Sequence, residues 1–208
     1  MKVVVLGATG GTGLEIVRAA LYRSHSVTAL VRSPEKLNGF RDRISVIQGD
    51  LLNSVELERA IRDHDAVISG FGPRIPIAKG DRDLLQRFAQ ALRSAMMVTG
   101  VSRVVVESVA FLFKNTLFPP VYLLGRLFFP AVVADASAME RIFAESPLEW
   151  TMVRPPELTD APYTGQYRFT EGRLPKFGFK VSRADVADYM VRALEIPESV
   201  GKVVGVAS

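Results

Sequence analysis

The sequence contains no cysteine, two histidines and one tryptophan among its 208 residues. The lack of cysteine excludes disulfides, thiolate metal sites and cysteine nucleophiles, and it is compatible with a reducing compartment. His25 and His64 each precede an apolar segment, so we expect both in surface loops. No spacing of His, Asp and Glu of the kind that binds a metal occurs, and we expect no metal site.

The sequence also has little excess of one sign of charge over the other. The chain has 26 Lys and Arg against 22 Asp and Glu, a net charge of +4, and no Lys/Arg-rich block. This balance argues against nucleic acid and weakly favours small anionic ligands. No unbroken apolar run of about 20 residues is present, which excludes a membrane-spanning segment. The first apolar run starts at residue 2 and is too short for a signal peptide, so we expect a cytoplasmic protein.

What is present is an alternation of short apolar runs with segments of helical periodicity, which predicts a doubly wound parallel sheet. We expect a Rossmann-like α/β/α domain over residues 1–208, with a small substrate-side region at about 109–134 and 155–180. The expected strands are 2–6, 26–31, 44–47, 65–69, 101–108, 148–153 and 202–206. The clearest expected helices are 14–23, 81–99, 135–143 and 182–195.

The first strand runs directly into a glycine-rich turn, GATGGTG, followed by a helix. Gly7 allows a sharp turn off the strand, Gly10 lets the backbone approach a diphosphate, and Gly13 lets the helix pack closely on the strand. The free N–H groups at the helix start then bind the anion. This order of strand, glycines and helix predicts a dinucleotide site; the alternative is a glycine-rich turn without a ligand. The expected cofactor residues of the turn are Gly7, Thr9, Gly10, Gly11, Thr12 and Gly13.

Arg32 stands at the end of the second strand, where an acidic residue would bind the ribose 2′-hydroxyl of NAD. A guanidinium there suits a 2′-phosphate instead, and Ser33 and Lys36 follow closely. The sequence therefore predicts NADP(H), the alternative being a solvated arginine.

Three further segments follow strands at the same expected edge of the sheet. Asp50, beside Leu51, is expected to accept a hydrogen bond from the adenine amino group, or else only to cap the next helix. Gly70, Phe71 and Gly72 would let the cofactor approach the backbone. Ser108 ends the fifth strand near the expected nicotinamide.

The stretch 109–134 is rich in phenylalanine and poor in charge, and prolines interrupt it. We expect a folded lid over the substrate pocket, or a self-association surface. Within it Tyr122 lies four residues before Arg126, a spacing that resembles a catalytic Tyr and Lys pair, so Ser108 and Tyr122 are the candidate catalytic residues.

These residues together resemble the atypical short-chain dehydrogenase/reductases that bind NAD(P)H, and most of all the biliverdin-IX-beta/flavin reductases. The motifs that carry the resemblance are the glycine turn, Leu30-Val31-Arg32, Gly49-Asp50, Ala110-Phe111-Leu112, Arg154-Pro155-Pro156 and Thr164-Gly165-x-Tyr167. The resemblance implies a cofactor bed at the glycine turn, Arg32, Asp50 and Gly70–Gly72, with Ser108 and Pro155 near the nicotinamide.

The sequence departs from those reductases at two positions. Val109 stands in register with their serine, and Glu157 stands where they have a histidine after Pro-Pro. These departures weaken the case for biliverdin as substrate and leave cofactor binding intact.

Three functions remain open. The first is an NADPH-dependent reductase of a flat conjugated acceptor such as a flavin or quinone, with Phe111, Glu157 and Tyr163 as substrate residues. The second is a redox sensor resembling the nitrogen-metabolite-repression regulators, and the third is a carbonyl reductase or sugar epimerase that uses Tyr122. The expected partner is a small aromatic or conjugated acceptor, and the expected state is a monomer or homodimer.

Overall fold

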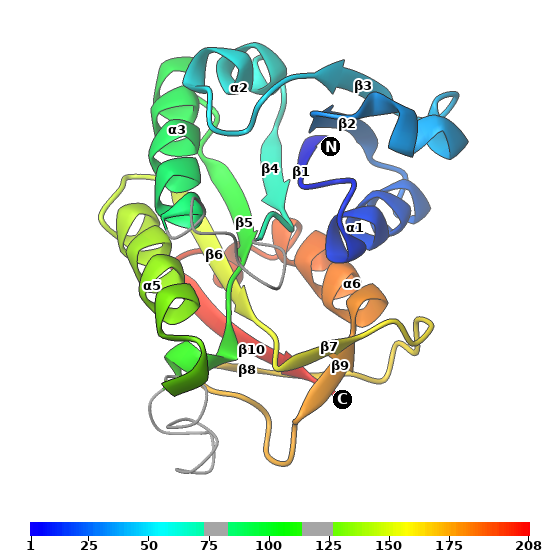
Figure 1. Ribbon diagram of the computed structural model, residues 1–208. Helices are drawn as coiled ribbons and strands as arrows, with labels where there is room; N and C mark the ends of the chain where they lie inside the picture. The colour runs from blue at the N-terminus through cyan, green and yellow to red at the C-terminus, as the bar shows by residue number, and fades with distance from the viewer. Residues whose placement is uncertain (73–82, 114–126) are drawn as a thin grey trace.

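The computed structural model describes residues 1–72, 83–113 and 127–208. Its centre is an eight-stranded sheet in the order β3-β2-β1-β4-β5-β6-β10-β8 (Figure 1). The strands are β1 (Lys2–Leu6), β2 (Ser26–Val31), β3 (Ser45–Gln48), β4 (Ala66–Ser69), β5 (Arg103–Glu107), β6 (Glu149–Arg154), β8 (Arg168–Glu171) and β10 (Lys202–Ala207). Neighbouring strands pair in parallel except β10 and β8, which are antiparallel. The expectation of a doubly wound α/β/α sheet is confirmed, with one antiparallel strand added.

Helices cover both faces of this sheet (Figure 1). One face carries α1 (Gly11–Tyr22) and α6 (Arg183–Leu194), and the other carries α2 (Ser54–Ile61), α3 (Leu84–Thr99) and α5 (Pro130–Ala144). Alternate residues of β1 supply the two cores: Val3 and Val5 pack with α1 and α6, whereas Val4 and Leu6 pack with the other helices. A strand buried on both faces reads as a continuous apolar run, which is why β1 was recognisable from sequence.

Short-range signals set several helix ends. Asn53 caps α2 by accepting hydrogen bonds from the N–H groups of Val55 and Glu56. Ser182 caps α6 through the N–H of Asp185, and α3 ends at Gly100, whose φ of +75° suits glycine. Helix α5 begins at Pro130, five residues before the start of the helix expected at 135–143, and proline is common at the first position of a helix.

The chain from 155 to 182 differs most from the sequence prediction. Strand β8 joins the main sheet at its edge, and β7 (Glu157–Thr159) pairs in parallel with β9 (Lys180–Ser182) as a small second sheet. Three-residue and four-residue strands give too short a pattern to separate from a loop. Short 3₁₀ helices occur at Pro34–Phe40, Ala110–Leu112 and Pro197–Ser199.

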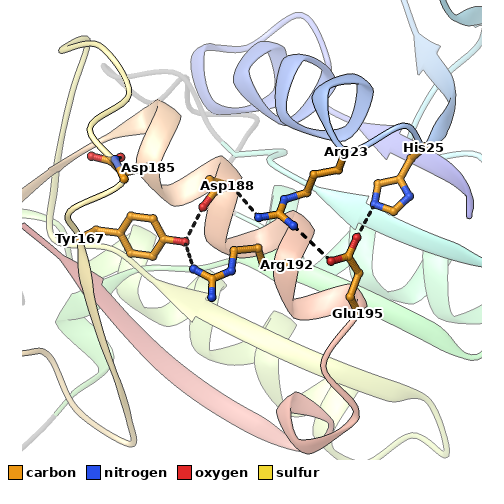
Figure 2. Close-up of polar contacts among 8 residues, drawn as sticks. Arg23, His25, Tyr167, Asp185, Asp188, Arg192 and Glu195 are labelled. Atoms are coloured by element: carbon orange, nitrogen blue, oxygen red, sulfur yellow. Dashed lines mark hydrogen bonds and ion pairs between the residues drawn. The ribbon is translucent and has the colours of Figure 1, made fainter.

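Charged and polar side chains join the end of α1 to α6 and to Tyr167 (Figure 2). Arg23, at the end of α1, lies 3.2 Å from carboxylate oxygens of both Asp188 and Glu195. The Tyr167 hydroxyl donates to Asp188 over 2.6 Å and accepts from Arg192 over 3.1 Å. These contacts fix the two helices that frame the glycine turn.

His25 belongs to the same cluster, and the expectation that it lies in an exposed loop is wrong. Its side chain is buried, with Nε2 3.1 Å from a Glu195 oxygen (Figure 2). Burial, followed by the nearby N-terminal ammonium, lowers the pKa of His25 below its usual value.

Within residues 1–72, 83–113 and 127–208, no helix is long and apolar enough to cross a membrane.

Candidate dinucleotide site

Close contacts in the glycine turn determine the path of the backbone from β1 into α1. Gly7 has a φ of +76°, and a Cβ on it would lie 2.8 Å from the Phe71 backbone. A Cβ on Gly13 would lie only 2.0 Å from the carbonyl oxygen of Gly7. The turn therefore packs backbone against backbone at both glycines, and α1 starts with its N–H groups directed toward the carboxyl edge of the sheet.

Two adjoining cavities of about 240 and 260 Å³ lie in front of this turn. They share a wall formed by Gly7, Thr9, Arg32, Leu51 and Phe71. The first cavity also contacts Gly10, Asp50, Gly70 and Gly72, and the second contacts Ser33 and Lys36. The structure thus brings together most of the cofactor residues expected from sequence, drawn from the ends of β1, β2, β3 and β4.

The basic side of this site is at the end of β2. Arg32 and Lys36 are both exposed, and Ser33 precedes a 3₁₀ turn that returns Lys36 to the same cavity as Arg32. Two cations and a hydroxyl on one cavity wall suit an anionic group of a ligand.

Asp50 lines the first cavity together with Arg32, and its local contacts bear on the expected role as a helix cap. Its carboxylate accepts a hydrogen bond from the N–H of Leu52 over 3.1 Å, and its own N–H donates to Glu56. The cap of α2 is Asn53, so the alternative that Asp50 caps that helix is wrong. In the first cavity, the Asp50 carboxylate is available as an acceptor for a ligand donor.

Two residues beside the glycine turn, Glu107 and Arg183, were not predicted from the sequence. Glu107 ends β5 and accepts a hydrogen bond from the Thr12 hydroxyl of α1 over 3.2 Å. Removal from water raises the pKa of the Glu107 carboxyl to about 7, against the smaller opposing effects of Thr12 and Arg183. The signal available in sequence was an acidic residue directly after the apolar run Val104–Val106 of this strand.

Arg183 is the first residue of α6 and lies over the start of α1. Its Cδ and Nε are 2.7 Å from where a Cβ on Gly11 would stand, and its guanidinium forms a 2.6 Å ion pair with Asp160. A cation therefore lies beside the helix start that is expected to hold the diphosphate. Some 170 positions separate Gly11 from Arg183, so no local pattern could have joined them.

Of the two candidate catalytic residues, the structure describes Ser108. Ser108 is buried, and its hydroxyl oxygen has no hydrogen-bond partner among the described residues. The backbone N–H of Ser108 donates to Val153, which continues the pairing of β5 with β6. Tyr122 lies outside the described residues.

The candidate substrate residues occupy different places. Phe111 is half-buried and stacks on Phe129 with ring centroids 6.2 Å apart. Pro155 is buried and accepts a hydrogen bond from the Ala110 N–H, beside this pair. Glu157 is exposed at the start of β7. Tyr163 lines a separate cavity of about 380 Å³ between α1 and α6, with Arg18 and Asp188.

The geometry of the glycine turn fits a dinucleotide. The glycines let the backbone pack closely at the N-terminus of α1, the end of β2 adds a basic wall to the adjoining cavity, and Arg183 adds a cation beside the helix start. A group with two phosphates and a further anion matches that arrangement of charge.

Comparison with known proteins agrees with this geometry. A family model described as NAD(P)H-binding matches residues 7–197. An uncharacterised chloroplastic protein of Arabidopsis thaliana is 31% identical over 219 residues, covering 100% of this chain and 76% of that protein. The uncharacterised protein YwnB of Bacillus subtilis is 26% identical over 208 residues, covering 95% and 94% of the two chains.

Among solved structures, a short-chain dehydrogenase/reductase of Veillonella parvula in complex with NADP superposes with a TM-score of 0.81. The two chains are 19% identical and are covered to 100% and 94%, so this likeness concerns the fold. The chain belongs to the NAD(P)H-binding family of Rossmann-fold proteins.

Proposed function

We propose that the protein is an NADPH-dependent reductase that passes hydride to a flat conjugated acceptor, such as a flavin or a quinone. NAD(P)H binding follows from the family, and the observation that carries the choice of NADPH is the basic cavity wall. Arg32 and Lys36 face one cavity at the end of β2, the place where the adenosine ribose lies in this fold. A 2′-phosphate there gains charge-assisted hydrogen bonds that a 2′-hydroxyl does not.

The remaining cofactor contacts divide along the site. The glycine turn and the start of α1 would bind the diphosphate, with Arg183 adding positive charge, and Asp50 would accept from the adenine amino group. Burial brings the pKa of Glu107 to about 7, so at neutral pH its carboxyl is partly protonated and repels the diphosphate less than an ionised group would.

The acceptor would lie beside the stacked pair of Phe111 and Phe129, with Pro155 at the base of the site. The nicotinamide supplies the hydride when it is bound. The residues of this chain would then orient a planar acceptor and exclude water from the reacting atoms. Such a reaction does not require a strong acid, and the buried hydroxyl of Ser108 suits it.

The test is the binding of NADPH and NADH to wild type and to Arg32→Ala. We expect the dissociation constant for NADPH to rise roughly 10- to 100-fold, since a charge-assisted hydrogen bond contributes about 1.5–3 kcal/mol, while NADH binding changes little. Arg93→Ala, an exposed arginine on α3, is the matched control. An unchanged NADPH-to-NADH ratio in Arg32→Ala would overturn the cofactor assignment.

One observation favours a second function, a sensor that binds NADP(H) without turnover. Val109 and Glu157 replace the serine and histidine of the reductases that the chain resembles. Steady-state NADPH oxidation with flavin, quinone and aldehyde acceptors separates the two. Turnover with flat acceptors supports the reductase, and tight NADPH binding without turnover on any acceptor supports the sensor. Turnover confined to aldehydes would support the third function, which uses Tyr122.

A further inference from the structure

The loop between β8 and β9 carries aromatic rings outward that nothing in the dinucleotide site requires. Phe177 and Phe179 are 85% and 62% exposed. Phe177 also has a φ of +58°, a left-handed conformation that a bulky side chain rarely adopts. The loop thus holds a large apolar side chain in water and in an unfavourable backbone conformation, which is typical of a functional surface.

Packing contacts and a hydrogen bond attach the loop to the rest of the protein. Leu174 is buried against Ala110 and Phe113. A Cβ on Gly178 would lie 2.3 Å from the Cβ of Ala207, so the backbone between the two rings is pressed onto the end of β10. Arg168 of β8 donates to the carbonyl of Lys176 over 2.8 Å. The exposure of the rings is therefore built into the fold and is not the result of a loosely packed segment.

Several cations lie in this loop and next to it. Arg173, Lys176 and Lys180 are exposed within the same eight residues, and Arg168 lies at the base of the loop. Two acidic residues lie beside the loop: Glu171 forms an ion pair with Lys202 over 2.7 Å, and Glu157 of β7 is the register partner of Lys180. The cations outnumber these carboxylates, so the loop presents apolar rings beside a net positive charge, unlike the mixed charge of the whole chain.

We propose that this loop, residues 173–180, docks on an anionic lipid surface, with the two rings entering the interfacial layer and the cations facing lipid phosphates. Anionic headgroups attract juxtaposed Lys and Arg, and apolar rings gain by leaving water at the interface. Charge complementarity favours this occupant over a second copy of the chain, because two copies of the same basic loop repel one another. The proposal is independent of the proposed reductase activity.

The experiment is co-sedimentation of the full chain with vesicles of phosphatidylcholine and phosphatidylglycerol at about three to one, and with phosphatidylcholine alone. We expect binding to the anionic vesicles that falls as salt is raised, and little binding to the neutral ones. The double variants Phe177→Ala with Phe179→Ala, and Lys176→Gln with Lys180→Gln, should each bind roughly tenfold more weakly, from lost apolar burial in one and lost cations in the other. Tyr22→Ala is the matched control, since Tyr22 is 88% exposed on α1.

The variant Phe177→Asn distinguishes weaker lipid binding from a loss of folded structure. Asparagine tolerates a positive φ, so this variant should unfold at a higher temperature than wild type while binding vesicles less well. Equal binding to neutral vesicles, or no binding to anionic ones, would overturn the proposal. So would self-association of the wild-type chain without lipid that Phe177→Ala abolishes, because the surface would then be a contact between copies.

Discussion

The two ends of the candidate site are built in different ways. At the cofactor end, Gly7 and Gly13 pack backbone on backbone, and the cavity walls come from the ends of four neighbouring parallel strands. At the proposed acceptor end, Phe111 and Phe129 stack on each other, and Phe129 is 40% exposed. Close backbone contacts determine the structure of the first end, whereas the second end consists of partly exposed aromatic rings. A fold can therefore keep one cofactor site and vary what it reduces.

The largest effect should come from filling the closest contact at the cofactor end. Gly13→Ala places a Cβ 2.0 Å from the Gly7 oxygen, so α1 must move away from β1. We expect a loss of about 3 kcal/mol or more in the free energy of unfolding, together with loss of NADPH binding. Denaturant unfolding and fluorescence titration measure the two. Gly39→Ala is the control, because no atom lies within 4 Å of its added Cβ; equal losses in both variants would contradict this account.

Glu107 should make stability depend on pH. Its pKa is about 7 in the folded protein and 4.5 in an ordinary environment, so between these values the folded state holds the proton more tightly. The contribution of Glu107 to stability is therefore lost as pH rises from about 4.5 to 7, by roughly 3 kcal/mol, and is constant above that.

Glu107→Gln should remove this contribution and be more stable than wild type at pH 8. Urea unfolding at pH 5 and pH 8 measures the difference between the two proteins at each pH. Glu145→Gln, at an exposed position after α5, should leave the pH dependence of wild type intact. A difference between wild type and Glu107→Gln that is the same at both pH values would show that this carboxyl does not titrate in the window.

The smallest effect on stability is expected at the acceptor end. Phe129→Ala removes one ring of an exposed stacked pair, so the free energy of unfolding should fall by less than about 1 kcal/mol. Under the proposed function, the KM for a flat acceptor should nevertheless rise several-fold while NADPH binding stays constant. A drop in stability like that of Gly13→Ala would mean that the two ends are not built differently.

The sequence predicted the parts of the molecule that follow local rules. Buried parallel strands appear as apolar runs, and the glycine turn appears as three glycines at fixed spacing, so β1, α1 and the cavity residues up to Gly72 were foreseeable. Strand β8 was not, because four residues with three of them exposed carry no strand pattern.

The site residues that were missed depend on contacts between distant segments. Glu107 and Arg183 reach the glycine turn only once β5 and α6 pack beside α1. His25 is buried because Glu195, far along the chain, provides its partner. Ser108 was expected as the last residue of the fifth strand, whereas β5 ends at Glu107 and the Ser108 hydroxyl beyond it is buried.

Strand β8 also bears on how the molecule behaves at high concentration. It is an outermost strand of the large sheet, where unpaired backbone groups invite another chain to add a strand. The strand is only four residues long, and charged residues, Arg168 and Glu171, stand at its two ends. Such a short, charged border offers a poor template for intermolecular pairing, which helps to keep the sheet from growing beyond one molecule.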